Sequence, residues 1–172
     1  MPTLYILCGL PFSGKTVLAK QLTDKLGFAV VGIDAIRENR GFSWEDNEKV
    51  TTEDWQSIFQ ESYDRTLALL ARGKSIIYDS ANQDRISRDR LRALAAKGGY
   101  PTRVIFMDVP EREVRGRWLQ NQKSGQRFHL PEKWFQAAID TFEPPTADEN
   151  VIRYNQRMDF EKWVQEHFTT EK

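Results

Sequence analysis

One eight-residue segment constrains this chain more than any other feature. Gly9-Leu10-Pro11-Phe12-Ser13-Gly14-Lys15-Thr16 matches the pattern G-x-x-x-x-G-K-[ST] at every position. A nearly continuous apolar run, residues 3–8, leads into it, and residues 15–26 carry apolar side chains at helical spacing. A buried strand before the loop and a helix after it are the context in which such a loop wraps a phosphate chain. The sequence therefore predicts a phosphate-binding loop at the first strand of an α/β domain.

Each residue type in this loop suits a particular contact with a nucleotide. The glycines let the backbone turn so that N–H groups point inward, and the helix that begins near Lys15 adds the positive end of its dipole. Lys15 supplies a charge for the β- and γ-phosphates, and Thr16 supplies a hydroxyl for Mg²⁺. We expect ATP rather than GTP, because the chain has no N-K-x-D tetrapeptide for reading guanine. The predicted nucleotide-binding residues are Gly9, Leu10, Pro11, Phe12, Ser13, Gly14, Lys15, Thr16 and Val17.

The rest of the chain alternates strand-like with helix-like segments, which is typical of a parallel sheet with crossover helices. The clearest helix is 52–72, where apolar side chains recur every three or four residues. Further strands are expected at 28–33, 75–78, 102–109 and 150–154, and further helices at 35–40, 85–97, 110–122, 131–139 and 159–168. The 172 residues therefore predict one α/β domain with about five parallel strands.

Composition excludes several classes of protein. Hydrophobic residues make up 40% and charged residues 29%, a globular balance, and no apolar run is long enough to span a membrane. The single cysteine, Cys8, rules out an internal disulfide, and two histidines leave little material for a zinc site. The first residues lack the basic region of a signal peptide, so we expect a cytoplasmic location. Twenty-five basic and 25 acidic residues cancel, which argues weakly against a polyanionic partner.

Two aspartates follow strands whose carboxyl ends should face the ligand crevice. Asp34 comes after the second strand, where a carboxylate can take the proton of an attacking hydroxyl; the alternative is that it caps the short helix 35–40. Asp79 ends the third strand, as in the Walker B pattern, where the carboxylate reaches Mg²⁺. We therefore predict Asp34 as a catalytic base and Asp79, with Thr16, as a metal ligand.

Cationic and amide side chains near these positions are candidates for binding the acceptor and the phosphates. Arg37 lies one helical turn after Asp34, with a solvated surface arginine as the alternative; Asn82 and Arg85 follow Asp79, with helix capping as the alternative for Asn82. The stretch 111–133 is rich in arginine, and we expect a mobile lid at about 115–131 that brings Arg117 and Arg127 to the phosphates. Arg117 is also expected to contact the nucleotide.

With these residues in view, the chain resembles the P-loop kinases that include polynucleotide 5′-hydroxyl kinases, zeta-type toxins and chloramphenicol phosphotransferases. The resemblance rests on the loop 9–16, on Asp34 with Arg37, on Asp79 with Asn82 and Arg85, and on the arginine-bearing helix after Pro110. It implies a three-layer fold with strand order 2-3-1-4-5 and a small helical lid. It also implies a base role for Asp34 and acceptor binding by Arg37. Ala81 departs from the family, which often has a hydroxyl residue there.

The predicted activity is transfer of the γ-phosphoryl group of ATP, with Mg²⁺, to a hydroxyl of a small-molecule acceptor. Lys15, Asp34, Arg117 and Arg127 are the predicted catalytic residues. Two alternatives stay open: a kinase that acts on the 5′-hydroxyl of a nucleic acid, and an ATP-binding regulatory or toxin-like protein without significant turnover. The sequence indicates neither the acceptor nor the oligomeric state.

Overall fold

The computed structural model of the chain, described here for residues 1–168, contains a five-stranded, all-parallel sheet in the order β2-β3-β1-β4-β5. This confirms the expected strand number and order. The strands are β1 (Leu4–Cys8), β2 (Ala29–Gly32), β3 (Ile76–Asp79), β4 (Thr102–Met107) and β5 (Val151–Tyr154). The helices are α1 (Lys15–Leu26), α2 (Ile33–Asn39), α3 (Thr52–Ala71), α4 (Arg85–Lys97), α5 (Glu111–Ser124), α6 (Glu132–Asp140) and α7 (Phe160–Phe168), with short 3-10 turns η1 (Asn47–Lys49) and η2 (Ala147–Glu149).

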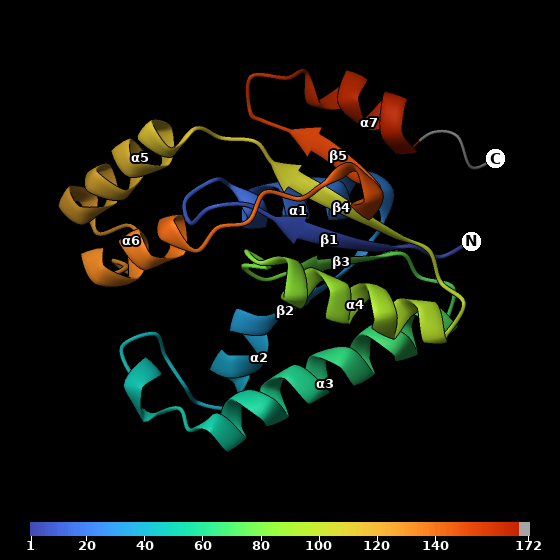
Figure 1. Ribbon diagram of the computed structural model, residues 1–172, viewed down its shortest axis with the longest axis horizontal. Helices are drawn as coiled ribbons and strands as arrows, with labels where there is room; N and C mark the ends of the chain where they lie inside the picture. Colours follow the sequence, from blue (N-terminus) through green and yellow to red (C-terminus); the bar gives the residue numbers. More distant parts are fainter. Residues whose placement is uncertain (169–172) are drawn as a thin grey trace.

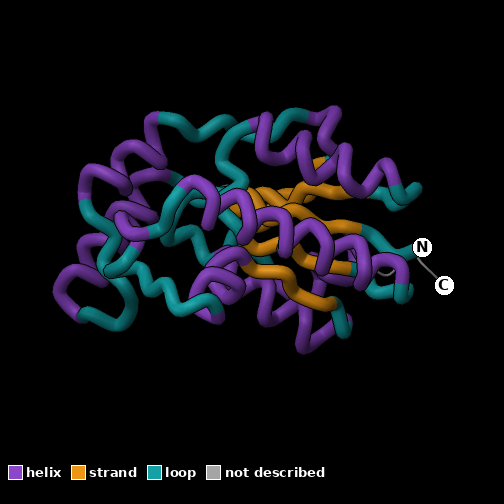
Figure 2. Tube along the Cα trace, turned by 90° about the horizontal axis from the view of Figure 1, so that it is seen from below, coloured by secondary structure: helices purple, strands orange, loops and turns teal. Residues whose placement is uncertain are grey.

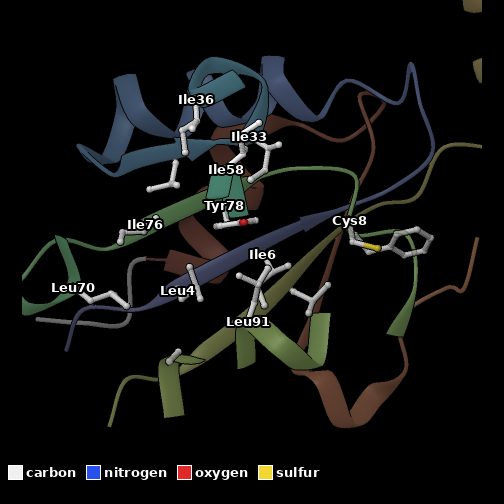
Figure 3. Close-up of a cluster of buried hydrophobic side chains, with 14 residues drawn as sticks. Leu4, Ile6, Cys8, Ile33, Ile36, Ile58, Leu70, Ile76, Tyr78 and Leu91 are labelled. Atoms are coloured by element: carbon white, nitrogen blue, oxygen red, sulfur yellow. The ribbon is translucent and has the colours of Figure 1, made fainter. Parts of the chain in front are cut away.

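Helices cover both faces of the sheet (Figures 1 and 2). Side chains of β1 alternate between the two faces, because successive residues of a strand point in opposite directions. Leu4, Ile6 and Cys8 pack with α2, α3 and α4 in one hydrophobic cluster, which Figure 3 shows in close-up. Tyr5 and Leu7 pack with α1 and α7 in a second cluster. The central strand is therefore buried on both sides, as its unbroken apolar sequence predicts.

The carboxyl ends of the strands share one edge of the sheet, at the left of Figure 1, and α5 and α6 lie beyond that edge. A third, smaller hydrophobic cluster holds these two helices together through Val114, Trp118 and Phe135. The Trp118 side chain also donates a hydrogen bond from Nε1 to the carbonyl of Leu130, at 2.7 Å. Trp118 is thus a core residue of this helical unit rather than a stacking platform for a base.

Three details differ from the sequence-based expectations. Helix α2 begins at Ile33 with Gly32 as its N-cap, so Asp34 lies in the first turn and is not the cap. Val17, which was expected in the apolar stripe of the first helix, is 62% exposed, and Ala19 is buried instead. The segment 41–50, expected to be a loop throughout, contains η1.

Among the described residues no helix is long and apolar enough to cross a membrane.

Candidate active site

The loop between β1 and α1 has the tight geometry that its glycines allow. A Cβ on Gly9 would lie 2.8 Å from the Cβ of Met107 and 2.9 Å from Ser13 Oγ, so there is no room for a side chain. Gly14 has a φ of 93°, and a Cβ there would collide with the amide of Gln156. Gly9 therefore requires glycine for steric reasons, whereas at Gly14 the positive φ is the main requirement, because the Gln156 amide is the end of a flexible side chain that can move. Ser13 Oγ is also buried, and it has no hydrogen-bond partner among the described residues.

Lys15 closes over this loop. Its Nζ donates hydrogen bonds to the carbonyl oxygens of Gly9, at 2.8 Å, and Leu10, at 2.9 Å. Desolvation by burial lowers the pKa of Lys15 to about 8, although the Asp79 carboxylate acts in the opposite direction. The ammonium group is thus held by two carbonyl dipoles, and no carboxylate of residues 1–168 is in direct contact with it, so a phosphate anion could bind it.

Asp79 and Thr16 meet at the entrance to the loop. Thr16 Oγ1 donates a hydrogen bond of 2.9 Å to Asp79 Oδ2. Burial raises the pKa of Asp79, against the opposing effects of this hydrogen bond and of Lys15. Residues 1–168 contain no group of three His, Cys, Asp or Glu side chains that could enclose a metal ion. A hydroxyl and one carboxylate nevertheless fit Mg²⁺, which usually takes one or two protein ligands and fills its octahedron with phosphate oxygens and water.

Asp34 stands at the carboxyl end of β2, in the first turn of α2. Its carboxylate accepts no hydrogen bond from any described residue, and the residue is exposed at the surface. Desolvation of its inner side raises the pKa of Asp34; the charge of Arg37 opposes this effect, and the nearby Asp79 carboxylate adds to it. A carboxylate that is unbonded, accessible and made more basic is suited to accept a proton.

Arg37 is completely buried, so the alternative of a solvated surface arginine is wrong. Its Nη1 donates to the carbonyl of Ser43 at 3.0 Å, but Nε and Nη2 have no partner among residues 1–168. The guanidinium lies 3.8 Å from the ring centre of Trp44, which in turn stacks on Phe128, with centroids 5.6 Å apart and planes 16° apart. Two buried N–H groups without acceptors are unusual, and an anion bound beside them would accept their hydrogen bonds.

The two expected lid arginines converge on Phe12 of the loop. Arg117, on α5, donates from Nη1 to the carbonyl of Phe12 at 3.1 Å and is paired with Glu113 at 2.8 Å. Arg127 places its guanidinium 4.1 Å from the ring centre of Phe12, and burial together with the charge of Arg117 lowers the pKa of Arg127. A hollow of about 550 Å³ lies between these arginines and the start of α1, with Gly14 and the exposed Val17 on its wall.

Asn82 and Arg85 have other contacts in the structure. Asn82 is buried, and its Nδ2 donates to the carbonyl of Leu7 at 2.8 Å, which ties the loop after β3 to the central strand. Arg85 forms ion pairs with Asp89 at 2.9 Å and Asp148 at 2.6 Å, at the outer end of α4. These contacts give both side chains structural roles, and the substrate-binding roles expected of Asn82 and Arg85 stay predictions. The side chain that caps α4 is that of Asp84, which accepts from the Ser87 amide.

Three features escaped the sequence analysis because they join distant segments. Gln156, in the loop after β5, donates from Nε2 to the carbonyl of Ser13 at 2.6 Å. Arg88 and Glu149 form a fully buried ion pair at 2.6 Å, and Arg88 also bonds the Asn82 carbonyl. The stack of Trp44 on Phe128 connects the α2–α3 segment to the expected lid. Only for Gln156 was there a usable signal, since every loop at the carboxyl edge of a parallel sheet is a candidate.

The fold and the arrangement at this edge define a P-loop protein with a kinase fold. Residues 4–145 match the model of a family described as an AAA domain, and the chain belongs to that family. The expected resemblance to P-loop kinases is thereby confirmed at the level of family and fold. No curated protein sequence matches the chain significantly.

Solved structures resemble the whole chain at low sequence identity. A putative kinase from Chloroflexus aurantiacus has a TM-score of 0.75 and 20% identity, covering 96% of this chain and 95% of that one. Kti12 from Chaetomium thermophilum, solved in complex with ADP-AlF3, has a TM-score of 0.71 and 18% identity, covering 94% of each chain. An unliganded sugar kinase from Janibacter has a TM-score of 0.69 and 22% identity, covering 96% of this chain and 92% of that one. At these identities the likeness is one of fold.

Proposed function

We propose that the protein is an ATP- and Mg²⁺-dependent kinase that transfers the γ-phosphoryl group to a hydroxyl of a small-molecule acceptor. The observation that carries the proposal is the position of Asp34. Its unbonded carboxylate lies within electrostatic reach of both Lys15 and Asp79 and has a raised pKa. A base beside a phosphate loop is what a kinase requires, whereas a protein that only binds nucleotide has no use for it.

In the proposed reaction the acceptor oxygen forms a bond to the γ-phosphorus while the bond from that phosphorus to the β–γ bridging oxygen breaks. Asp34 receives the hydroxyl proton, and the bond electrons remain on ADP. Lys15 and the inward amides of the loop hold the β- and γ-phosphates, and Arg117 and Arg127 approach from the lid at 115–131 to neutralise charge on the transferred group. Thr16 and Asp79 would hold Mg²⁺, which supplies charge neutralisation across the phosphates.

The acceptor would enter beside the loop after β3, on the face of the sheet that α2, α3 and α4 cover. Arg37 supports this direction, because its two unpartnered N–H groups are buried one helical turn from Asp34. The sugar kinase among the structural neighbours acts on a small molecule, in keeping with this choice. The neutral net charge also favours a small acceptor over a nucleic acid 5′ end, since a polyanion usually needs several free cationic contacts. The free, buried thiol of Cys8 is compatible with the cytoplasmic location that we propose.

The test replaces Asp34 with asparagine and measures transfer from γ-labelled ATP to a panel of metabolites, nucleosides and 5′-hydroxyl oligonucleotides. We expect Asp34→Asn to lower the transfer rate by roughly 10²- to 10⁴-fold, the usual contribution of a general base, with nucleotide affinity unchanged within about twofold. Glu38→Gln, on the same helix, is the matched control and should retain transfer. Undiminished transfer by Asp34→Asn would reject the base assignment, and absence of ATP binding by the wild-type chain would reject the whole proposal.

Because the pKa of Asp34 is raised, the rate should depend on pH in a defined direction. As the pH falls through this raised pKa, Asp34 takes up a proton and can no longer act as a base, so the rate declines. The acid limb of the pH–rate profile should therefore lie above the ordinary aspartate pKa of 3.8. A profile that stays flat down to that value would contradict the assignment.

A further inference from the structure

A second hollow lies on the other side of the phosphate loop from the lid arginines. It has a volume of about 250 Å³ and opens between α3 and α4, beside the loop that follows β3. Phe59 and Tyr63 of α3 form one wall; Ser80 and Gln83 of the loop and Ser87 and Arg90 of α4 form the other. It belongs to the face of the sheet that α2, α3 and α4 cover, whereas the larger hollow is bounded by α1 and α5.

The α3 wall of this cavity is aromatic. The rings of Phe59 and Tyr63 are neighbours along the helix, with centroids 6.3 Å apart and planes 34° apart. Behind them Tyr78 is buried, and its hydroxyl is within hydrogen-bond distance of Ser62 Oγ, at 2.7 Å. Because the Tyr78 hydroxyl already forms this hydrogen bond, the inner wall presents mainly the apolar ring to a ligand. Such a surface favours a flat or ring-shaped ligand that covers an aromatic face.

The opposite wall is polar and has unused hydrogen-bonding groups. The hydroxyls of Ser80 and Ser87 have no hydrogen-bond partner within residues 1–168. Arg90 is exposed and, unlike Arg85, Arg88 and Arg92 on the same helix, forms no ion pair with a described residue. An unpaired guanidinium at the mouth of a cavity is suited to a carboxylate or a phosphate.

The floor of the cavity is held rigidly. Asn82 has a φ of 44°, in the left-handed region that asparagine tolerates better than most residues. Its side chain donates a hydrogen bond to the Leu7 carbonyl at 2.8 Å, and Arg88 Nη1 donates one to the Asn82 carbonyl at 3.1 Å. The loop therefore needs little ordering when a ligand binds, which is the usual state of a small-molecule site.

The location of the cavity connects it to the proposed chemistry. Ser80 on its rim directly follows Asp79, whose carboxylate bonds Thr16 of the phosphate loop. In sheet order β3 lies between β2, which leads to Asp34, and β1, which leads to the loop. A molecule in this cavity would therefore lie against the loop that directly follows Asp79, next to the sheet edge at which Asp34 and the phosphate loop also lie.

Resting on the proposed kinase function, we infer that this α3–α4 cavity binds the phosphoryl acceptor, and that the acceptor is a compact ring compound carrying a hydroxyl and an anionic group. The ring would cover Phe59 and Tyr63, the serine hydroxyls would bond its polar edge, and Arg90 would pair with its anion. A cavity of 250 Å³ is below the usual range of roughly 300–1,000 Å³ for ligand pockets, so it has room for one ring but not for a polynucleotide end.

The experiment uses γ-labelled ATP and paired acceptors that differ in charge: glucuronate against glucose, ribose 5-phosphate against ribose, and 4-(hydroxymethyl)benzoate against benzyl alcohol. A 5′-hydroxyl oligonucleotide is added as the competing class. The variants are Arg90→Gln, which removes the exposed charge, and Ser87→Leu, which fills the cavity. Arg72→Gln is the matched control, because Arg72 is exposed at the far end of α3 and is also without an ion pair among the described residues. ATP affinity is measured separately for every variant.

We expect at least one anionic member to be used roughly tenfold or more better, in kcat/KM, than its neutral partner, as one charge-assisted hydrogen bond provides. Arg90→Gln should remove that preference and Ser87→Leu should raise the acceptor KM roughly tenfold, with ATP affinity unchanged in both.

Three results would overturn the inference: equal use of the charged and neutral acceptors, use of the oligonucleotide alone, or no turnover of any acceptor by a protein that binds ATP. So would an unaltered preference in Arg90→Gln, a variant that leaves the core untouched. Failure of the wild-type chain to bind ATP would instead overturn the proposed function.

Discussion

At the scale of the residue, the loop lysine shows how burial and charge compete at one atom. Desolvation lowers the pKa of Lys15 to about 8, although Asp79 favours its charged form. Its ammonium donates hydrogen bonds to the Gly9 and Leu10 carbonyls. Phosphate groups carry full negative charge, so they would stabilise the ammonium far better than these dipoles and would raise its pKa when they bind.

Nucleotide binding should therefore take up a proton. As the pH rises through about 8, free Lys15 loses its proton while the bound form keeps it, so affinity declines by roughly tenfold between about pH 7 and pH 9. Calorimetry with a non-hydrolysable ATP analogue in two buffers of different ionisation enthalpy would report the uptake. Lys15→Met should bind more weakly at neutral pH and show no such uptake. An equal proton balance in both proteins would contradict this account.

At the scale of the element, α5 and α6 and the loop between them contact the rest of the molecule at a few points. Arg117 and Arg127 touch Phe12, and Phe128 stacks on Trp44. The stack joins the predicted lid segment to Arg37, because the Arg37 guanidinium lies 3.8 Å from the ring centre of Trp44. We propose that it favours the closed position of the lid, which keeps water from the transferred phosphoryl group.

Phe128→Ala should loosen the lid without altering the phosphate loop. An aromatic pair contributes about 0.5–1.5 kcal/mol, so the ratio of closed to open lid should fall by roughly two- to tenfold. The expected result is a higher ratio of ATP hydrolysis to acceptor phosphorylation, measured as free phosphate released per phosphorylated product. Phe128→Tyr keeps the stacked ring and serves as the control. An unchanged ratio in Phe128→Ala would show that the stack has no part in closure.

At the scale of the whole molecule, one buried ion pair connects the elements around the site. Arg88 and Glu149 are about 1% and 0% exposed at the side chain, and Arg88 also bonds the carbonyls of Asn82 and Glu143. Burial, the largest single effect, would raise the pKa of Glu149, but the hydrogen bonds from Arg88 and the Thr146 amide, together with the charges of Arg88 and Arg85, hold the pKa below its ordinary value. Helix α4, the loop after β3 and the segment before β5 thus depend on one guanidinium.

Arg88→Met should destabilise the fold by about 3–5 kcal/mol, because it leaves the Glu149 carboxylate buried without its partner. Adding Glu149→Leu should recover much of that loss, since the unpaired charge is then removed. Arg92→Gln, which breaks a partly exposed ion pair with Asp89 on the same helix, is the comparison and should cost far less. Chemical denaturation of the three variants and the wild type tests this order, and a double variant no more stable than Arg88→Met would contradict it.

The sequence anticipates features that depend on local pattern. The apolar run of β1 and the spacing of glycines in the loop specify a buried strand and a phosphate-binding turn, because both follow from conformational limits on a few adjacent residues. The carboxyl ends of parallel strands share an edge, so Asp34 and Asp79 were predictable as neighbours of the loop. The strand order was anticipated through family resemblance, since periodicity alone does not show which strands pair.

The contacts of long side chains were less predictable. Arg37, Arg85 and Arg88 have similar local sequence surroundings, rich in charge and on helices, yet Arg37 is buried under Trp44, Arg85 is paired at the surface, and Arg88 forms the internal ion pair. The partner of each arginine depends on segments far away in the sequence, such as Glu149, 61 residues from Arg88, and Asp148, 63 residues from Arg85.

From residues 9–16 and the strands around them, the primary structure alone was enough to indicate a phosphate loop in an α/β fold, because backbone conformation and hydrophobic periodicity are short-range properties. The cavity between α3 and α4, the stack of Trp44 on Phe128 and the burial of Arg37 arise only when the chain is packed. Desolvation and ion pairing depend on distances in space, and distances between segments far apart in sequence are set by the folded arrangement as a whole.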